Sequence, residues 1–484
     1  MTADYIAFHA EQRPDAPAFL SNGNAVSYAV VASNIRSFTR RLREFEIPAG
    51  GTVVVGCENV YIHLVILFAC ERLGLATASL IANEREVALP LLEGADLVLS
   101  ETPLPERARP RRSEILNQAW IDGAQGLSAV ETEPLPVPPA ESALRILRTS
   151  GTTGAPKRLH LTRRMFDAWT SRWIWCYGLG IGTRTLTVMP FSIGGAYAQI
   201  CATLRAGGTV VREGRMEVAE ALRTHKIDLV VMLPTHLREV LAKMAVGFER
   251  MPGLVIATFG GAISASLRAE AVARLCGALS DMYGCNEVGF IGTNGLHRAA
   301  DNLDIWPGVA IEAVDEQGQI LPWGQPGRLR VRTESMFSGY LDDPRTTQRM
   351  LRDGWFYPGD IGVLHGPRRL ELLGRADDLL NFEGRKVLPE ALEEHLRRAS
   401  GIAELAIGSV LGRDGAAELC IALVGTGPLD TQTMSRLEAS VGGAGFRKFA
   451  LVWLPRLPRN HAGKLQRNVL KTEIDAARRN RPSG

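Results

Sequence analysis

The chain has 484 residues, of which 46% are hydrophobic and 22% are charged, and its formal net charge is +3. This length exceeds what one hydrophobic core usually organises, so two or more domains are expected. The nearly balanced charge gives no basis for binding nucleic acid or an anionic membrane surface, and the composition is that of a soluble globular protein.

The seven cysteines are scattered and form no C-x-x-C pair. Such spacing favours free thiols in a reducing compartment over a disulfide framework or a zinc site. The N-terminal segment lacks the basic-then-apolar pattern of a signal peptide. The most apolar run, residues 60–70, is too short to span a bilayer. We therefore expect a cytoplasmic protein without a transmembrane segment.

Helix and strand patterns alternate from the start of the chain. An opening helix is followed by a basic amphipathic helix, which Ser27 is expected to cap and which ends near Phe45. A buried strand is predicted at residues 51–56, an apolar helix at 61–73, and strand character again before residue 80. This alternation favours a parallel sheet with helices on its faces.

The same rhythm continues towards residue 340. The predicted strands cover residues 143–147, 157–162, 185–189, 208–211, 227–233 and 254–259, and the predicted helices cover 164–175 and 195–205. Several of these strands end in glycine or proline, which is where α/β sheets bind ligands. A β-hairpin is expected at 309–322, and residues 324–375 are predicted to be rich in strands.

After residue 375 the pattern changes to that of a small α+β domain. Its expected helices cover residues 387–398 and 431–441, with a basic helix from Lys464, and its expected strands cover 405–411, 418–424 and 450–454. The predicted domains are therefore 1–375 and 376–484.

The segment 149–157 reads TSGTTGAPK and combines small hydroxyl residues with glycines and a lysine. Its backbone N–H groups can approach a polyphosphate closely, and the lysine adds a charge-assisted hydrogen bond. The residues predicted to hold phosphate are Thr149, Ser150, Gly151, Thr152, Thr153, Gly154 and Lys157. A flexible polar turn is the alternative. A Walker-type P-loop does not fit, because Lys157 is followed by Arg158 and then by a strand-like segment.

A second motif, YGCNE, covers residues 283–287. Tyr283 beside Gly284 suits a flat base that stacks on a ring, and the Glu287 carboxylate suits Mg²⁺, which takes oxygen ligands. The local alternative is a turn with a solvated glutamate.

Four further segments also contain glycines beside charged or aromatic residues. They are Gly260-Gly261-Ala262, WFYPGD at 355–360, GRADD at 374–378 with GRK at 384–386, and LPRNHAGK at 457–464. Taken singly, each has an ordinary local interpretation, as a turn or as the start of a surface helix.

Together, these six motifs resemble, in order and approximate spacing, those of the adenylate-forming, or AMP-binding, superfamily, which includes acyl-CoA synthetases, peptide-synthetase adenylation domains and beetle luciferases. The resemblance extends from about residue 5 to about residue 470. It implies an α/β fold in which a large N-terminal domain has parallel and mixed sheets flanked by helices, plus a β-rich subdomain. A hinge would join it to the small α+β domain.

The resemblance also implies roles for single residues. The adenine and ribose would be bound by Gly260, Gly261, Ala262, Tyr283, Gly284, Asp360 and Arg375. Glu287 would serve Mg²⁺, Asn286 would take the place of a threonine at the α-phosphate, and Asp377 would be the hinge. Lys464 would be the catalytic lysine that stabilises charge during adenylation. The sequence departs from the family pattern at Arg158, Arg163, Asn286 and Pro358.

The implied reaction converts a carboxylic acid and ATP to acyl-AMP and pyrophosphate, and then transfers the acyl group to the thiol of coenzyme A. ATP, Mg²⁺ and CoA are thus the expected cofactor and co-substrates. The acyl pocket is expected near Ser192, Gly194 and Gly195, which follow Pro190-Phe191. No aspartate lies between Pro190 and Arg205, which favours an acid without an α-amine. Trp173, Trp175 and Tyr177 are expected in an apolar pocket or in the core.

Several alternatives stay open. The acceptor thiol belongs either to CoA or to an acyl carrier protein in trans. A non-catalytic nucleotide-binding relative is a third hypothesis, and a luciferase-like oxygenase has less support. The acid class, whether aryl or a fatty acid of short, medium or long chain, is not determined by the sequence, and a homodimer stays open.

Overall fold

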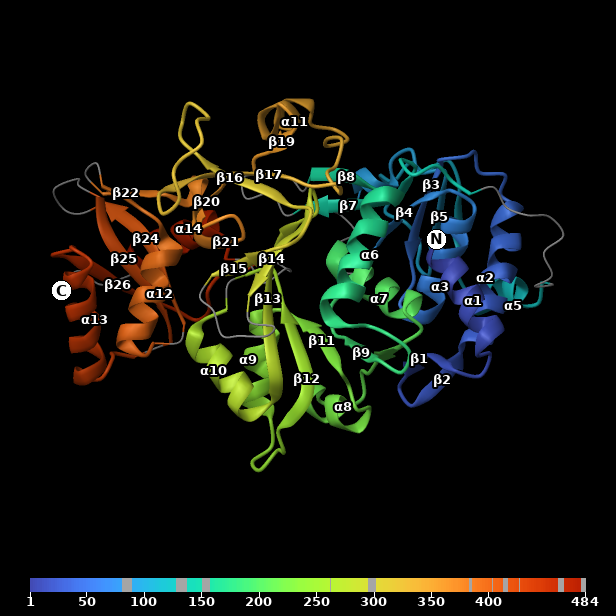
Figure 1. Cartoon of the computed structure of the whole chain (residues 1–484), viewed down its shortest axis with the longest axis horizontal. Coiled ribbons are helices and arrows are strands. Elements are labelled where there is room, and N and C mark those ends of the chain that lie inside the picture. Colours follow the sequence, from blue (N-terminus) through green and yellow to red (C-terminus); the bar gives the residue numbers. More distant parts are fainter. Residues whose placement is uncertain are drawn as a thin grey trace.

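The computed structural model describes residues 1–80, 89–127, 137–149, 157–261, 263–294, 302–382, 385–402, 404–411, 417–425, 427–459 and 465–479. In Figure 1 the N-terminal elements, in blue, lie at one end of the long axis and the C-terminal elements, in orange and red, lie at the other.

One sheet of the described chain has six strands in the order β6-β5-β3-β4-β7-β8. They are β3 (Thr52–Gly56), β4 (Ala76–Ser79), β5 (Leu97–Ser100), β6 (Ser113–Ile115), β7 (Ala143–Thr149) and β8 (Lys157–Thr162). Neighbours are parallel except for β7 and β8, which are antiparallel. The predicted phosphate-binding loop therefore joins two antiparallel strands, as the alternating exit segment indicated.

The largest sheet has fifteen strands within the described ranges, and its strand pairing changes from mostly parallel to antiparallel beyond β13. Its parallel half contains β1 (Pro17–Ser21), β9 (Arg184–Thr187), β10 (Thr209–Arg212), β11 (Leu229–Met232), β12 (Met251–Thr258) and β13 (Cys276–Cys285), with β2 (Asn24–Ser27) antiparallel to β1 at the edge. Beyond β13 every pairing is antiparallel, and this part is the β-rich subdomain. Its strands are β14 (Gly289–Asn294), β15 (Leu303–Ile305), β16 (Ala310–Val314), β17 (Pro326–Arg332), β18 (Leu351–Arg352), β19 (Trp355–Phe356), β20 (Asp360–Leu364) and β21 (Arg369–Arg375).

Helices cover these sheets and fill the space between them (Figure 1). They are α1 (Thr2–Gln12), α2 (Tyr28–Arg43), α3 (Val60–Arg72), α4 (Leu89–Leu92), α5 (Gln118–Gln125), α6 (Arg163–Tyr177), α7 (Gly194–Arg205), α8 (Val218–Thr224), α9 (Pro234–Lys243), α10 (Ala265–Arg274) and α11 (Pro344–Met350). Nearly all side chains of α3 and α7 are buried, as expected of helices that are apolar on all sides. The predicted cap of α2 is confirmed, since the Ser27 hydroxyl accepts a hydrogen bond from the Val30 N–H.

The C-terminal part has its own small sheet and core. The described strands β24 (Leu405–Leu411), β25 (Ala417–Val424) and β26 (Phe449–Leu454) pair in that order, beside the two-stranded sheet of β22 (Leu380–Phe382) and β23 (Arg385–Val387). The helices α12 (Pro389–Ser400), α13 (Thr431–Gly443) and α14 (Arg467–Arg479) accompany them, and a one-turn 3₁₀ helix, η2 (Ala376–Asp378), links β21 to β22. The α+β pattern predicted for this region is confirmed.

Two predicted helix starts in this part were wrong. The helix expected at residue 387 begins at Pro389, because residue 387 still pairs in β23 and proline suits the first helical position. The helix expected to begin at Lys464 begins at Arg467, after Leu465 pairs with Arg459 in an isolated bridge. The β1–β2 hairpin was not predicted at all, since each of its strands has only four or five residues.

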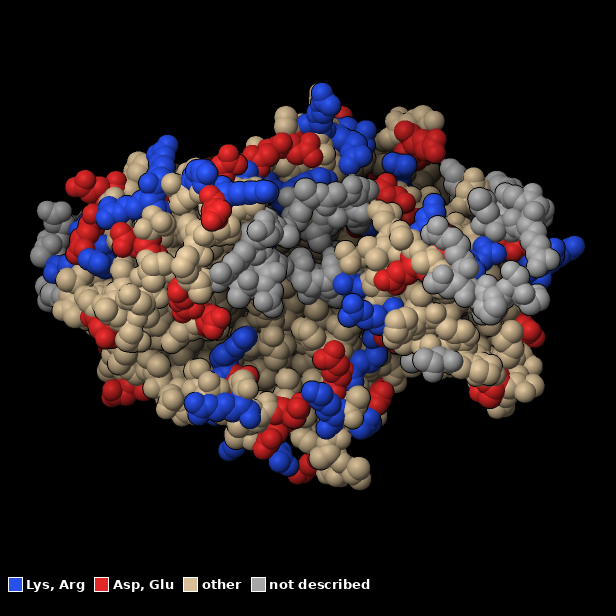
Figure 2. Space-filling model, turned by 180° about the vertical axis from the view of Figure 1, so that it is seen from behind, with Lys and Arg blue, Asp and Glu red and all other residues tan. Residues whose placement is uncertain are grey.

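The surface shows no segregation of charge on the face drawn in Figure 2, where basic and acidic side chains are interspersed. Within the described ranges, none of the helices combines the length and the apolar character that a membrane crossing requires.

Candidate active site

Tyr283, Asp360 and Arg375 come from three distant motifs and lie in contact. The Tyr283 hydroxyl donates to Asp360 Oδ2 over 2.5 Å, and Arg375 Nη1 donates to Asp360 Oδ1 over 3.3 Å. Asp360 and Arg375 are paired residues of the antiparallel strands β20 and β21, so strand register alone places them side by side. We call these three residues the carboxylate cluster.

Burial shapes the chemistry of the carboxylate cluster. Asp360 is 9% exposed, and burial, together with the Asp360 carboxylate, raises the pKa of Tyr283 well above its ordinary value. The tyrosine therefore remains a hydrogen-bond donor at neutral pH. Arg375 also donates to the Pro358 carbonyl oxygen, so Pro358, which stands where the family commonly has threonine, contributes through its main chain.

The structure explains two of the glycines near this cluster, Gly260 and Gly284, in different ways. Gly260 follows β12 with φ +86°, a backbone conformation that favours glycine. Gly261 has open space around the position of a Cβ atom, whereas a Cβ on Gly284 would lie 2.5 Å from the Gly289 carbonyl oxygen. Gly284 is thus required by the close pairing of β13 and β14. Ala262 lies outside the described residues.

Asp281 lies two residues before Tyr283 in β13 and connects this strand to the end of β12. The Thr258 hydroxyl donates to Asp281 Oδ1 over 2.9 Å. Burial raises the pKa of Asp281 to about 6, and this rise is opposed by the Thr258 hydrogen bond and by Arg268. The two strands that end at the predicted adenine site are therefore joined by a side-chain hydrogen bond as well as by their main chains.

Glu287 lies in the turn between β13 and β14 and is only 7% exposed. The interpretation of this segment as a turn with a solvated glutamate was therefore wrong. Tyr340 covers the carboxylate and donates from its hydroxyl to Glu287 Oε1 over 2.7 Å. Burial and this carboxylate raise the pKa of both Tyr340 and the neighbouring Cys285 thiol, so both groups stay protonated beside it.

The ends of the predicted phosphate-binding loop lie close to the same residues. Thr149 and Lys157 face each other across β7 and β8, and Lys157 Nζ lies 5.2 Å from the centre of the Tyr340 ring. Asn286 donates to the Arg148 carbonyl oxygen over 3.4 Å. Ser150, Gly151, Thr152, Thr153 and Gly154 lie outside the described residues. The described residues on either side of them, Arg148 and Lys157, lie close to Asn286 and to the Tyr340 ring.

The predicted acyl pocket is closely packed at its glycines. A Cβ on Gly194 would lie 2.8 Å from a Leu147 methyl group, 3.0 Å from Asn286 Oδ1 and 3.1 Å from the Trp169 ring. Gly195 faces the Phe259 ring, and Ser192 is half-buried. The start of α7 thus lies beside Asn286, so the predicted acyl and phosphate regions adjoin each other.

The aromatic residues of α6 divide between core and surface. Trp169 and Trp173 are buried, and Trp173 stacks on Tyr177 with ring centroids 5.0 Å apart. Trp175 is 68% exposed and contacts Trp306 instead. Trp175 therefore lies on the surface and not in an apolar pocket, while Trp169, which lies against Gly194, was not recognised from the sequence.

Arg158 and Arg163, two further departures from the family pattern, also have structural partners. Arg158 pairs with Asp342 and donates to the Pro90 carbonyl oxygen. Arg163 donates to the Pro138 carbonyl oxygen and lies 3.6 Å from Asp167. Arg158 thus ties the end of the predicted phosphate-binding loop to the Tyr340 segment, whereas Arg163 contacts the loop before β7.

The predicted hinge and catalytic lysine belong to the C-terminal part. Asp377 is exposed in η2. Lys464 lies outside the described residues, between Arg459 and Leu465, which pair in an isolated bridge. Arg467, which the sequence did not single out, donates to Glu390 and Glu393 and lies 3.4 Å from Asp378. Arg467, three residues after Lys464, therefore contacts the residue next to the predicted hinge.

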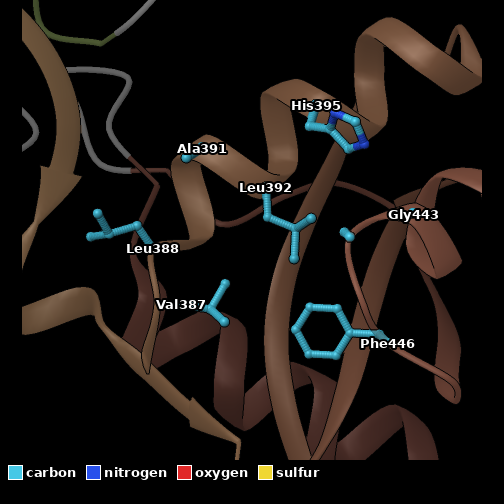
Figure 3. Close-up of a pocket in the computed structure, with 8 residues that line it drawn as sticks. Val387, Leu388, Ala391, Leu392, His395, Gly443 and Phe446 are labelled. Carbon is cyan, nitrogen blue, oxygen red and sulfur yellow. The ribbon is translucent and has the colours of Figure 1, made fainter. Parts of the chain in front are cut away.

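A separate pocket lies between α12 and the chain that follows α13, and Figure 3 shows its lining. Its volume is about 360 Å³, and it is lined by Val387, Leu388, Ala391, Leu392, His395, Gly443, Ala444 and Phe446. None of the predicted site residues that the structure describes lines this pocket, so it is distinct from the carboxylate cluster.

The sequence did not predict that Tyr340 would contact Glu287, or that Arg467 would contact Glu390 and Glu393. Tyr340 lies 53 residues after Glu287 in the chain, and no local pattern predicts that pairing. For Arg467, the nearest signal was its position three residues after Lys464, on the same face of the helix that was expected to begin there.

Comparison with known proteins places the chain among enzymes that adenylate their substrates. Residues 6–341 match the family described as AMP-binding enzyme. Among curated proteins, the chain is 28% identical to a fatty acid–[acyl-carrier-protein] ligase, ScoC, of Streptomyces coeruleorubidus, covering 98% of this chain and 96% of that protein. It is 26% identical to a 2-succinylbenzoate–CoA ligase of Bacillus licheniformis, covering 96% and 99%. Among solved structures, ATP-bound MatB from Rhodopseudomonas palustris is similar, with a TM-score of 0.84, 21% identity and coverage of 99% and 100%.

Proposed function

The chain belongs to the family of AMP-binding enzymes, and from that premise we propose that it activates a carboxylic acid with ATP and transfers the acyl group to the thiol of coenzyme A. The observation that supports this most is the carboxylate cluster. Tyr283, Asp360 and Arg375 come from three separate motifs, and the fold brings them into hydrogen-bond contact.

The adenosine would lie against this cluster. A carboxylate can accept hydrogen bonds from both ribose hydroxyls. Strand pairing with Arg375 fixes the position of Asp360, which would be that carboxylate. The adenine would stack on the Tyr283 ring beside Gly260 and Gly261. The triphosphate would then extend towards the Thr149–Lys157 end of β7 and β8, where Asn286 and Glu287 also lie.

Magnesium fits the donor set near Glu287. Protein sites for Mg²⁺ commonly supply one or two carboxylates and leave the other positions to water and substrate phosphates. In the described chain no cluster of three or more His, Cys, Asp or Glu side chains is arranged to hold a metal, so a site completed by phosphate oxygens is the arrangement that Glu287 can support. The ion would neutralise charge on the phosphates.

In the first half-reaction, a carboxylate oxygen of the acid forms a bond to the α-phosphorus of ATP, and the bond to the pyrophosphate oxygen breaks. Asn286, which lies beside Gly194 and donates to the Arg148 carbonyl oxygen, would orient the α-phosphate next to the acid. Lys464 would stabilise the charge that develops on the oxygens in the transition state. In the second half-reaction, the thiol sulfur forms a bond to the acyl carbon and AMP leaves with the former carboxylate oxygen.

A carrier-protein acceptor is the second candidate function. It is favoured by the similarity to ScoC, which is named as a fatty acid–[acyl-carrier-protein] ligase. The similarity to a 2-succinylbenzoate–CoA ligase favours CoA. Both relatives match nearly the whole chain, although their names give different acids and acceptors. We therefore expect the residues that differ among these proteins to decide which acid and which acceptor are used.

The test is pyrophosphate release from ATP-Mg²⁺ with aryl, short-chain, medium-chain and long-chain acids, with and without CoA. Multiple turnovers that require CoA would establish the ligase and identify its acid class. Release that stops near one equivalent in the presence of CoA would indicate a carrier-protein acceptor. ATP binding without pyrophosphate release for any acid would contradict the proposed function and favour a non-catalytic nucleotide-binding protein.

A further inference from the structure

The strand that leaves the predicted phosphate-binding loop has contacts beyond its partner β7. Leu159 of β8 pairs with Tyr340 in an isolated antiparallel bridge. Next to it, the Leu341 N–H donates to the Arg158 carbonyl oxygen over 2.8 Å. Residues 340 and 341 are therefore attached by their main chains to the strand that begins with Lys157.

The Arg158 side chain strengthens this attachment. Its Nε donates to Asp342 Oδ2 over 2.6 Å, and its Nη2 contacts the same carboxylate, so the pair is held through two nitrogens. Its Nη1 donates to the Pro90 carbonyl oxygen at α4. A planar guanidinium can make such simultaneous contacts, whereas glycine, which is common at this position in the family, cannot. Arg158 thus fixes the segment that contains Tyr340.

Tyr340 in turn contacts both chemical groups at the phosphate end of the site. Its hydroxyl donates to Glu287 Oε1 over 2.7 Å, and Lys157 Nζ lies 5.2 Å from its ring centre. Its main-chain N–H donates to the Thr347 hydroxyl, and the side chain is only 7% exposed. The ring therefore has little freedom to move away from the carboxylate.

We propose that Tyr340 is a positioning residue for the Glu287 carboxylate, and that Arg158, through Asp342 and the main chain of residue 341, keeps Tyr340 in place. This inference rests on the proposed function, since it assumes that Glu287 receives the metal that accompanies the nucleotide. Groups that hydrogen-bond a metal-binding side chain fix its orientation, and their loss commonly weakens metal binding about 10- to 100-fold.

Metal binding can be measured without turnover. Full-length protein is mixed with α,β-methylene-ATP, which cannot release pyrophosphate, and titrated with MnCl₂ while electron paramagnetic resonance follows free Mn²⁺. We expect Tyr340→Phe to weaken nucleotide-dependent Mn²⁺ binding about 10- to 100-fold. Affinity for the same nucleotide in EDTA should stay within about twofold, because removing one hydroxyl leaves the carboxylate cluster intact.

Tyr61→Phe is the matched control, since the Tyr61 hydroxyl bonds to Asn34 and not to any site residue. Arg158→Asp should weaken Mn²⁺ binding, and Arg158→Asp combined with Asp342→Arg should restore most of it, because the reversed pair can hold the segment again. Recovery in the double variant would show that the single variant lost Mn²⁺ binding because the Tyr340 segment was released, and not because the protein unfolded.

Wild-type Mn²⁺ affinity in Tyr340→Phe would overturn this inference and leave the proposed function intact. If the wild-type protein bound no Mn²⁺ in the presence of the nucleotide, the metal role of Glu287 would fail, and the inference would fail with it. Failure of the reversed pair to recover Mn²⁺ binding, with both variants folded, would overturn the role of Arg158.

Discussion

The carboxylate cluster and the residues near the Lys464 segment are held in place in different ways. Asp360 and Arg375 are opposite residues of paired strands, and Tyr283 lies on a strand of the same sheet. Near the Lys464 segment, Arg459 lies 4.0 Å from Glu404, and Arg467 pairs with Glu390 of the C-terminal part.

This difference has a physical consequence. Strand register is shared by many main-chain hydrogen bonds and cannot change at one residue without changing along the strand. The contact of Arg459 with Glu404 is partly exposed, and such ion pairs contribute roughly 0–1 kcal/mol each and can exchange partners. We therefore expect the nucleotide side of the candidate site to stay fixed, and the side that contains Lys464 to move if Asp377 is the hinge.

The largest effect is expected at Lys464. Lys464→Ala should slow pyrophosphate release about 10²- to 10³-fold, the size of loss seen when one transition-state donor is removed. Thioester formation from acyl-AMP supplied in the assay should change little, because we expect rotation at the Asp377 hinge to remove the lysine from the site for that step. Lys471→Ala, at an exposed lysine of α14, is the control. Equal loss in both half-reactions would contradict the movement.

Asp360→Ala tests the fixed side of the comparison. The variant removes the acceptor for both ribose hydroxyls and the partner of Arg375, so we expect ATP affinity to fall by about 3 kcal/mol, roughly a hundredfold. Calorimetric titration with ATP measures it, and Asp122→Ala in α5 is the control at an exposed aspartate. Unchanged ATP affinity would exclude Asp360 from the nucleotide site.

Asp377→Pro tests the movable side without touching a reacting group. Proline restricts rotation about its own φ and about the preceding residue. We expect thioester formation to slow at least about tenfold, which corresponds to 1.4 kcal/mol of activation free energy, while pyrophosphate release is spared. Asp377→Ala should behave as wild type in both assays. If proline slowed both half-reactions equally, Asp377 would not be the hinge.

The sequence predicted features that depend on neighbouring residues, but not those that depend on residues far apart in the chain. Motif residues such as Tyr283 and Glu287 were found because each occupies a recognisable local string, and the alternation of helices and strands was found from periodicity. The cover over Glu287 was not predictable, since Tyr340 lies 53 residues further along the chain and outside the named strands. By contrast, Trp173 and Trp175 could have been separated in advance, because residues two apart on a helix point to opposite sides. Packing around Gly194 depends on Leu147, Asn286 and Trp169 together, and periodicity contains no such information.

The smallest effect is expected at the contact between the two parts of the chain. Glu404 accepts a hydrogen bond from Arg238 of α9 over 2.5 Å and lies 4.0 Å from Arg459, next to the Lys464 segment. Glu404→Arg places three cations together. Because these side chains are partly exposed, we expect pyrophosphate release to fall only about two- to fivefold, which is the effect of up to about 1 kcal/mol.

Combining Glu404→Arg with Arg238→Glu restores the attraction between α9 and the C-terminal part, and should recover most of the lost rate. About 0.5 M salt should reduce the wild-type rate towards that of the single variant, since screening acts strongly on exposed pairs. Thioester formation from supplied acyl-AMP should be insensitive to all of these changes. If the single variant slowed that second step instead, the pair would belong to the other orientation of the C-terminal part, and the structure would represent the arrangement adopted after adenylation.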